Sequence, residues 1–178
     1  MTKPGAAALA MRPSMAVSFL AALLLAAAMM VALMASTAHS APALERYHNE
    51  TFGFGLELPE ALLEEYRAAV SPEGITLTSP DGKAVVDIFG SPNEAGKSLA
   101  AVVDQFRSEM PDARITYEWR GRRAAVLSGY QDGDVFYIRI EMSPDRSRVA
   151  VLNMVYARDL KRQLDPVVAR LSSSLSFR

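Results

Sequence analysis

The stretch RYHNETFGFGLELPEALL, residues 46–63, joins a polar cluster to a regularly alternating run. The cluster His48-Asn49-Glu50-Thr51 comes first, the alternation follows over residues 52–58, and Pro59 ends it. Side chains of a strand point alternately to its two faces, so the large apolar residues of the run share one face. A histidine close to a glutamate raises the question of an active site, but we interpret the stretch as a polar turn followed by a core strand. The residues expected on the core face are Phe52, Phe54, Leu56 and Leu58.

The rest of the chain continues this pattern of short strands and tight turns. Residues 44–48 are expected to pair with 52–58, and Ser79-Pro80-Asp81-Gly82 supplies turn chemistry for a hairpin within residues 74–93. Residues 62–70 are expected to form a short helix or an irregular turn. Short connections predict an antiparallel meander of four further strands, and Gln131-Asp132-Gly133-Asp134 fits its tight hairpin turn. These four strands are expected at residues 113–120, 123–130, 135–142 and 148–156.

Two helices complete the pattern. Apolar residues recur at helical spacing within residues 98–110, where Ser98 is the expected N-cap, and again within residues 165–175. Asp165 is expected to cap the second helix, with Pro166 in its first turn. The sequence therefore predicts an α+β fold with an antiparallel sheet of about six to eight strands flanked by helices. Two strands are apolar on both faces, which favours a sheet covered on both sides, although the pattern leaves open how the two helices divide between the faces.

The amino-terminal segment has the features of a secretory signal peptide. Lys3 and Arg12 precede an uncharged apolar run at residues 16–35, and small residues follow it. We expect residues 1–40 to be removed by cleavage near Ser40/Ala41, which leaves a single domain of residues 41–178 in the periplasm or outside the cell. The alternative is an uncleaved anchor, because twenty apolar residues are long enough to cross a bilayer.

Charge and composition exclude several classes of function. Removal of residues 1–40 leaves 17 basic residues (19 minus Lys3 and Arg12) against 20 acidic ones, a net charge of −3, which does not fit binding to nucleic acid. Contact with a membrane is expected only if the leader is retained. The chain has no cysteine, and His48 is the one histidine after cleavage, so cysteine sites and three-histidine zinc sites are excluded. We expect no catalytic residues, metal or cofactor.

Candidate binding residues cluster in the meander. Arg120, Arg122 and Arg123 form the densest basic group, and Trp119 precedes them. Arginine and aromatic side chains are favoured at protein interfaces, so this turn could bind a partner, and Tyr117, Tyr130 and Tyr137 could line a groove beside it. Solvated arginines and core rings are the competing interpretation. Arg139 and Glu141 share one face of a strand between apolar neighbours, which predicts a partly buried ion pair.

Four segments of the chain resemble small exported bacterial domains of the PsbP-like sandwich family. They are YHNETFGFGLELP, GITLTSPDGKAVVDIFGSPN, LSGYQDGDVFYIRIEMSPD and DPVVARLSSSLSF, and the resemblance covers nearly all of residues 41–178. It implies a central antiparallel sheet with helices on both faces. Members of this broad group are mostly non-enzymatic accessory factors or have no assigned role, so the resemblance implies a fold and carries over no site residue.

Together these observations predict an exported, non-enzymatic accessory or binding domain of the bacterial cell envelope, with an envelope protein as its expected partner. The alternative is a small-ligand-binding or hydrolytic protein with a polar pocket near Arg139 and Glu141. The predicted partner-binding residues are Trp119, Arg120, Arg122, Arg123, Tyr137, Arg139 and Glu141.

Overall fold

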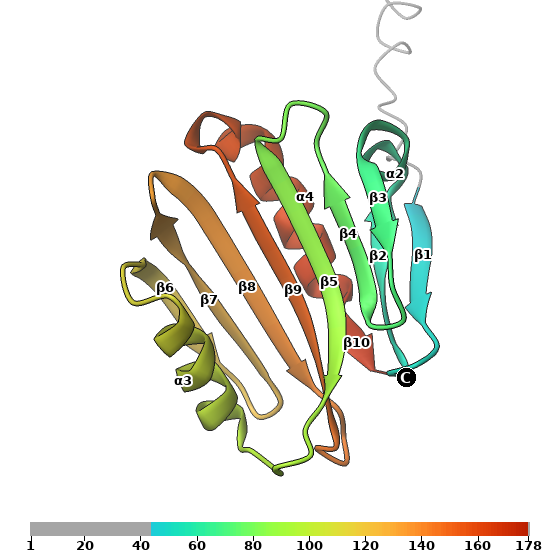
Figure 1. Ribbon diagram of the computed structural model, residues 1–178, viewed down its shortest axis with the longest axis vertical. Coiled ribbons are helices and arrows are strands. Elements are labelled where there is room, and N and C mark those ends of the chain that lie inside the picture. The colour runs from blue at the N-terminus through green and yellow to red at the C-terminus, as the bar shows by residue number, and fades with distance from the viewer. Residues whose placement is uncertain (1–43, 178) are drawn as a thin grey trace, which may run out of the picture. The chain divides into compact units, whose positions relative to one another are not determined.

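Seven antiparallel strands form the main sheet of the computed structural model, which describes residues 44–177 (Figure 1). Their order across the sheet is β3-β4-β5-β9-β8-β7-β6, so the predicted meander of the last four strands is confirmed. The strand β9 closes the meander and pairs with β5 from the first hairpin. The strands are β3 (Arg67–Val70), β4 (Gly74–Thr78), β5 (Ala84–Pro92), β6 (Arg114–Arg120), β7 (Ala124–Gln131), β8 (Asp134–Met142) and β9 (Arg148–Tyr156).

A second sheet of three strands contains the stretch that begins the domain. β1 (Leu44–Asn49) and the two-residue strand β10 (Ser176–Phe177) pair with opposite edges of β2 (Phe54–Pro59). Phe54, Leu56 and Leu58 of β2 are fully or almost fully buried, as the alternation predicted. The predicted leader and its cleavage site lie outside the described residues. Within residues 44–177 no helix combines the length and the apolar character that a membrane crossing requires.

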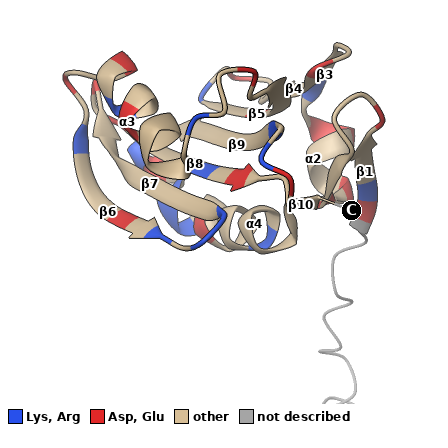
Figure 2. Ribbon diagram, turned by 90° about the horizontal axis from the view of Figure 1, so that it is seen from below, with Lys and Arg blue, Asp and Glu red and all other residues tan. Residues whose placement is uncertain are grey.

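The two long helices cover opposite faces of the main sheet, as Figure 2 shows. α3 (Leu99–Glu109) packs on the face formed by Ala125, Leu127 and Ile138, and Ser98 caps its first turn by accepting a hydrogen bond from the amide of Ala101 at 3.2 Å. α4 (Lys161–Ser174) packs on the other face, together with β2 and the short helix α2 (Glu60–Glu65). Each helix therefore has its own hydrophobic core, and the sheet is covered on both sides.

The polar cluster before β2 is a turn, although Phe52 does not lie in the strand, where the alternation placed it. The buried Asn49 side chain accepts a hydrogen bond from the amide of Phe52 at 2.8 Å and donates one to the carbonyl of Pro72 at 3.0 Å. Gly53 has a positive φ of 68°, so the chain turns there and β2 begins only at Phe54. Phe52 therefore precedes β2 instead of lying in it, but its half-buried ring packs beside Gly90 against the same core as Phe54, as predicted.

The two Ser-Pro-Asp turns have the same internal hydrogen bonds. The hydroxyls of Ser79 and Ser143 donate to Asp81 at 2.7 Å and to Asp145 at 2.6 Å, and each hydroxyl also accepts a hydrogen bond from the amide five residues along the chain. The carboxylates are thus occupied within their own turns, which agrees with their interpretation as turn residues. The hairpin turn at Asp132-Gly133 also forms as expected, with positive φ at both residues.

Two predicted elements differ from the structure. Residues 62–70 form neither one helix nor one turn, because α2 ends at Glu65 and β3 follows as an edge strand. The last helix begins before Asp165: the 3₁₀ turn η2 (Arg158–Leu160) leads directly into α4 at Lys161. The side chain of Asp165 accepts hydrogen bonds from Lys161 at 2.6 Å and from the Tyr156 hydroxyl at 3.1 Å, so its assignment as an N-cap was wrong.

Candidate functional site

Two large aromatic side chains on β6 are exposed to solvent. Tyr117 and Trp119 keep 55% and 44% of their surface accessible, and they point to the same face because they lie two residues apart in the strand. Their neighbours on β7 are Ser128 and Val126, on the face of the sheet that α4 covers elsewhere. Aromatic side chains of this size are usually buried, so the pair is a candidate contact surface.

Arg139 and Glu141 lie on the same face, one strand further into the sheet. Arg139 is opposite Val126 and Glu141 is opposite Ala124, so they follow the aromatic side chains across β7. Their ion pair is 2.9 Å long, and the two side chains are only 19% and 12% exposed, as the strand pattern predicted. The Nε atom of Arg139 is buried without a hydrogen-bond partner among residues 44–177. Burial raises the pKa of Glu141, and this effect exceeds the opposing attraction of Arg139.

Three other predicted site residues have different environments. Arg123 is half-buried, and its charge adds to the attraction on Glu141. Arg122 is exposed at the tip of the β6–β7 turn. The hydroxyl of Tyr137 is 2.6 Å from the hydroxyl of Ser172, so this ring belongs to the contact between β8 and α4. We define the aromatic face as Tyr117, Trp119, Arg139 and Glu141.

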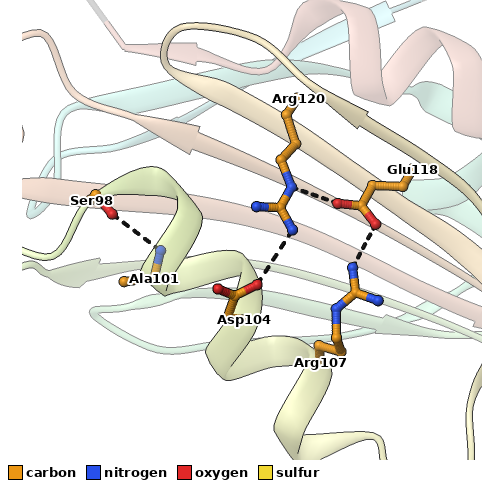
Figure 3. A network of polar contacts seen from close by, with 6 residues as sticks. All are labelled: Ser98, Ala101, Asp104, Arg107, Glu118 and Arg120. Atoms are coloured by element: carbon orange, nitrogen blue, oxygen red, sulfur yellow. Dashed lines mark hydrogen bonds and ion pairs between the residues drawn. The ribbon is translucent and has the colours of Figure 1, made fainter.

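Arg120 points away from the aromatic face, and its grouping with Trp119 was wrong. Neighbouring residues of a strand face opposite sides, and Arg120 lies on the side of α3 (Figure 3). Its guanidinium donates to Glu118 at 2.5 Å and to Asp104 of α3 at 3.3 Å. Arg107 of α3 donates to the other oxygen of Glu118 at 2.5 Å. Strict alternation, applied to residues 117–120, would have separated Arg120 from the two aromatic side chains.

These four charged residues attach α3 to the edge of the sheet. Hydrogen bonds from Arg120 and Arg107 lower the pKa of Glu118, and the bond to Glu118 raises the pKa of Arg120. Two positive and two negative groups balance, so the network carries no net charge. We define this set, Asp104, Arg107, Glu118 and Arg120, as the α3–β6 network.

Among residues 44–177 no three histidine, cysteine, aspartate or glutamate side chains come together as a metal site could require. Arg139 and Glu141 line none of four prominent surface hollows in residues 44–177. One of about 420 Å³ lies between α3 and β5 on the opposite face, with Phe89, Phe106 and Val151 in its wall. The alternative of a polar pocket around Arg139 and Glu141 gains no support from these hollows.

Comparison with solved structures identifies the architecture. The chain is similar to the solution structure of cyanobacterial PsbP (CyanoP) from Synechocystis sp. PCC 6803, with a TM-score of 0.58 and 12% identity over 79% of this chain and 96% of that chain. It is also similar to LpqN, involved in cell envelope biogenesis of Mycobacterium tuberculosis, with a TM-score of 0.47 and 15% identity over 75% of this chain and 90% of that chain. No family model and no curated protein matches the sequence. The chain therefore has a PsbP-like α+β fold, which at these identities is a statement about fold alone.

Proposed function

We propose that this chain is an exported, non-enzymatic accessory domain of the bacterial cell envelope that binds a protein partner through its aromatic face. The observation that carries the proposal is the exposure of Tyr117 and Trp119 on an edge strand, beside a desolvated pair of opposite charges. Tyrosine, tryptophan and arginine are the residues most enriched where interfaces concentrate their binding energy. The main sheet places Tyr117, Trp119 and Arg139 on the same face.

The exposed aromatic area is large enough to matter energetically. Each buried aromatic side chain removes about 150–250 Å² from water, and roughly half of that is still available on Tyr117 and Trp119. At about 25 cal/mol per Å², covering both would contribute about 5 kcal/mol before the costs of association. Association itself costs about 4 kcal/mol or more, so contacts around the two aromatic side chains would have to contribute as well for a transient complex to form.

Export is supported by the amino-terminal sequence. The uncharged run at residues 16–35 and the small residues after it are typical of a cleaved leader, although an uncleaved anchor would also place the domain outside the cytoplasm. Intact mass of the protein recovered from the envelope tests this directly. A species that begins near Ala41 supports cleavage, and a membrane-bound species that retains residues 16–35 supports the anchor. Recovery of the full chain in the cytoplasm would contradict export.

The binding proposal is tested by quantitative affinity capture from envelope extracts after mild cross-linking. The tagged full chain is compared with the double variant Tyr117→Ser/Trp119→Ser, and Val70→Ser serves as a matched control. Val70 is 75% exposed on β3, the opposite edge of the sheet, so its substitution removes exposed apolar surface without touching the aromatic face. We expect the same proteins to be enriched with the wild type and the Val70 variant, and to be lost with the double variant.

Two results would contradict the proposal. One is repeated capture in which no protein depends on Tyr117 and Trp119. The other is turnover of a small substrate by the purified protein that is lost on substitution of Arg139 or Glu141, since this would favour the hydrolytic alternative. Circular dichroism of each variant confirms that the comparison is made between folded proteins.

A further inference from the structure

The outer edge of β6 is a feature that the proposed function does not use. β6 is the last strand of the main sheet, so the backbone groups on its outer side pair with no other strand among residues 44–177. Exposed edges of this kind are usually protected by proline, by charged side chains and lysine above all, by very short length or by bulges. β6 has seven residues, contains neither proline nor lysine, and has its irregularity between Ile115 and Tyr117. The segment after that irregularity is regular, and its charged side chains are one acidic and one basic group, Glu118 and Arg120.

The direction of the backbone groups along this edge follows from the turn that ends β6. The amide of Gly121 donates to the carbonyl of Ala124 at 2.8 Å, which makes these two residues a hydrogen-bonded pair. Hydrogen-bonded and non-hydrogen-bonded pairs alternate in an antiparallel ladder. Trp119 therefore directs its N–H and C=O groups toward β7, and Glu118 and Arg120 direct theirs outward. Only outward-directed residues can form hydrogen-bonded pairs with an added strand.

One register of a second β6 strand satisfies both the hydrogen bonds and the charges. Centred on Trp119, an antiparallel copy places Glu118 opposite Arg120 of the second copy, twice by symmetry. Centring on Glu118 puts two carboxylates opposite each other, and centring on Arg120 does the same for two guanidinium groups. Centring on Tyr117 places Arg120 opposite Arg114 of the second copy. Opposite charges in facing positions stabilise a strand pair and like charges destabilise it, so among the registers centred on the regular segment, residues 117–120, the sequence favours the one centred on Trp119.

We propose that two copies of this chain associate through their β6 edges in the register centred on Trp119. The two main sheets then form one continuous sheet, and the two Trp119 side chains meet at the two-fold axis on the same face. Because the α3–β6 network is neutral in each copy, the association brings together no excess of charge. The oxygens of Glu118 each retain a second lone pair for the arginine of the other copy. The inference goes beyond the proposed function, since it concerns the backbone edge of the sheet.

The helices leave room for this pairing. α3 packs against β7, one strand inward from the edge. In the dimer, β7 and its symmetry copy are three strand spacings apart, or about 14 Å at ~4.8 Å per strand. Packed helices need only about 8–10 Å between their axes, so the two α3 helices do not collide. The interface is a single strand pair, and the dimer is therefore expected to depend on concentration rather than to be obligate.

The experiment is sedimentation velocity over a wide concentration range, with protein purified from cells that express the full chain. Trp119 is the only tryptophan, so its fluorescence reports on the two-fold axis as the protein is diluted. We expect a monomer–dimer equilibrium in the wild type. Glu118→Arg and Arg120→Glu should each weaken self-association by about tenfold or more, since each replaces two attractive facing pairs by two repulsive ones. Val70→Lys on the opposite edge strand should leave it unchanged.

Mixing the two charge variants gives the decisive result. A copy carrying Glu118→Arg presents two positive groups and a copy carrying Arg120→Glu presents two negative ones, so the mixture should form a heterodimer although neither variant dimerises alone. A loss of folding through the α3–β6 network could not produce this rescue. If either variant fails to fold, Trp119→Lys places two ammonium groups at the axis and should weaken the dimer by itself. A wild type that stays monomeric at all concentrations, or a mixture without heterodimer, would overturn the proposal.

Discussion

Removal of the positive partner of Glu141 should destabilise the domain in a way that depends on pH. Arg139→Met replaces the unbranched aliphatic part of the arginine side chain but leaves the carboxylate of Glu141, which is only 12% exposed, without its ion pair at 2.9 Å. Breaking a buried pair from one side costs about 3–5 kcal/mol in general. Protonation of the Glu141 carboxylate would remove part of this cost. The free energy of that protonation therefore sets an upper limit on the stability that Arg139→Met can lose.

The limit can be worked out from the ordinary pKa of glutamate. With a pKa of about 4.3 in the unfolded chain and ~1.36 kcal/mol per pH unit, neutralising Glu141 costs about 3.7 kcal/mol at pH 7 and about 1 kcal/mol at pH 5. Burial already raises the pKa of Glu141 in the wild type, and the loss of Arg139 raises it further. A raised folded-state pKa of an acid means that the folded state binds the proton more tightly, so stability is gained as pH falls and lost as pH rises toward that pKa.

We therefore expect Arg139→Met to lose up to about 3–4 kcal/mol at pH 7 and about 1 kcal/mol at pH 5, relative to the wild type at the same pH. Urea melts with linear extrapolation measure both values. Glu141→Gln is the matched control: it removes the carboxyl group whose protonation would relieve the cost, so the cost of that variant should not fall in acid. The reasoning is refuted if Arg139→Met loses the same free energy at both pH values.

Three further predictions concern the fold. Phe54→Ala should cost about 3–5 kcal/mol in a denaturant melt because Phe54 is fully buried, and His48→Ala, at an exposed position, well under ~1 kcal/mol; equal costs would contradict the face assignment. Gly74→Ala should prevent or severely impair folding, since the new Cβ would lie 1.9 Å from the carbonyl oxygen of Ile88. Gly82 has a positive φ of 72° and open space around it, so Gly82→Ala should cost only about 1 kcal/mol in the same assay. Hydrogen bonds from Ser143 and Ser147 hold the pKa of Asp145 far below its usual range. The contribution of Asp145 to folding stability is therefore present above the pKa of the unfolded chain and is lost as pH falls. In Asp145→Asn, the free energy of unfolding should depend less on pH in the acid range.

The sequence predicted those parts of the fold that local chemistry determines. Alternation identified β2, tight-turn residues identified the hairpins, and the cap at Ser98 placed the start of α3. Two short strands, β3 and β10, were not predicted, because four and two residues carry no periodicity and pair only where the rest of the fold presents an edge. The start of α4 was misplaced since Asp165-Pro166 has the chemistry of a helix start, and only the preceding 3₁₀ turn shows that the helix is already formed.

The sequence predicted the buried ion pair of the candidate site, but it did not predict how the arginines of the basic turn are arranged. A charged pair within a strand between apolar neighbours is visible in the sequence, and Arg139 and Glu141 form the expected ion pair. The basic turn was treated as one cluster because Arg120, Arg122 and Arg123 are close in sequence. Their separation follows from the pleat of β6 together with the position of α3, which supplies Asp104 and Arg107. The position of a helix relative to a sheet is a tertiary property, so local patterns could not indicate that Arg120 already has partners.

The two faces of β6 also depend on each other physically. An exposed edge strand with large side chains would normally be mobile, and the ordering of mobile side chains on binding costs free energy. The α3–β6 network restrains β6 from one side through Glu118, which accepts hydrogen bonds from Arg120 in the same strand and from Arg107 in the helix. Tyr117 and Trp119, which alternate with these residues, are thereby held in place while their rings stay exposed on the other side. In the proposed complex the charged residues of the α3–β6 network would therefore support the contact surface, and the aromatic residues that alternate with them would contact the partner.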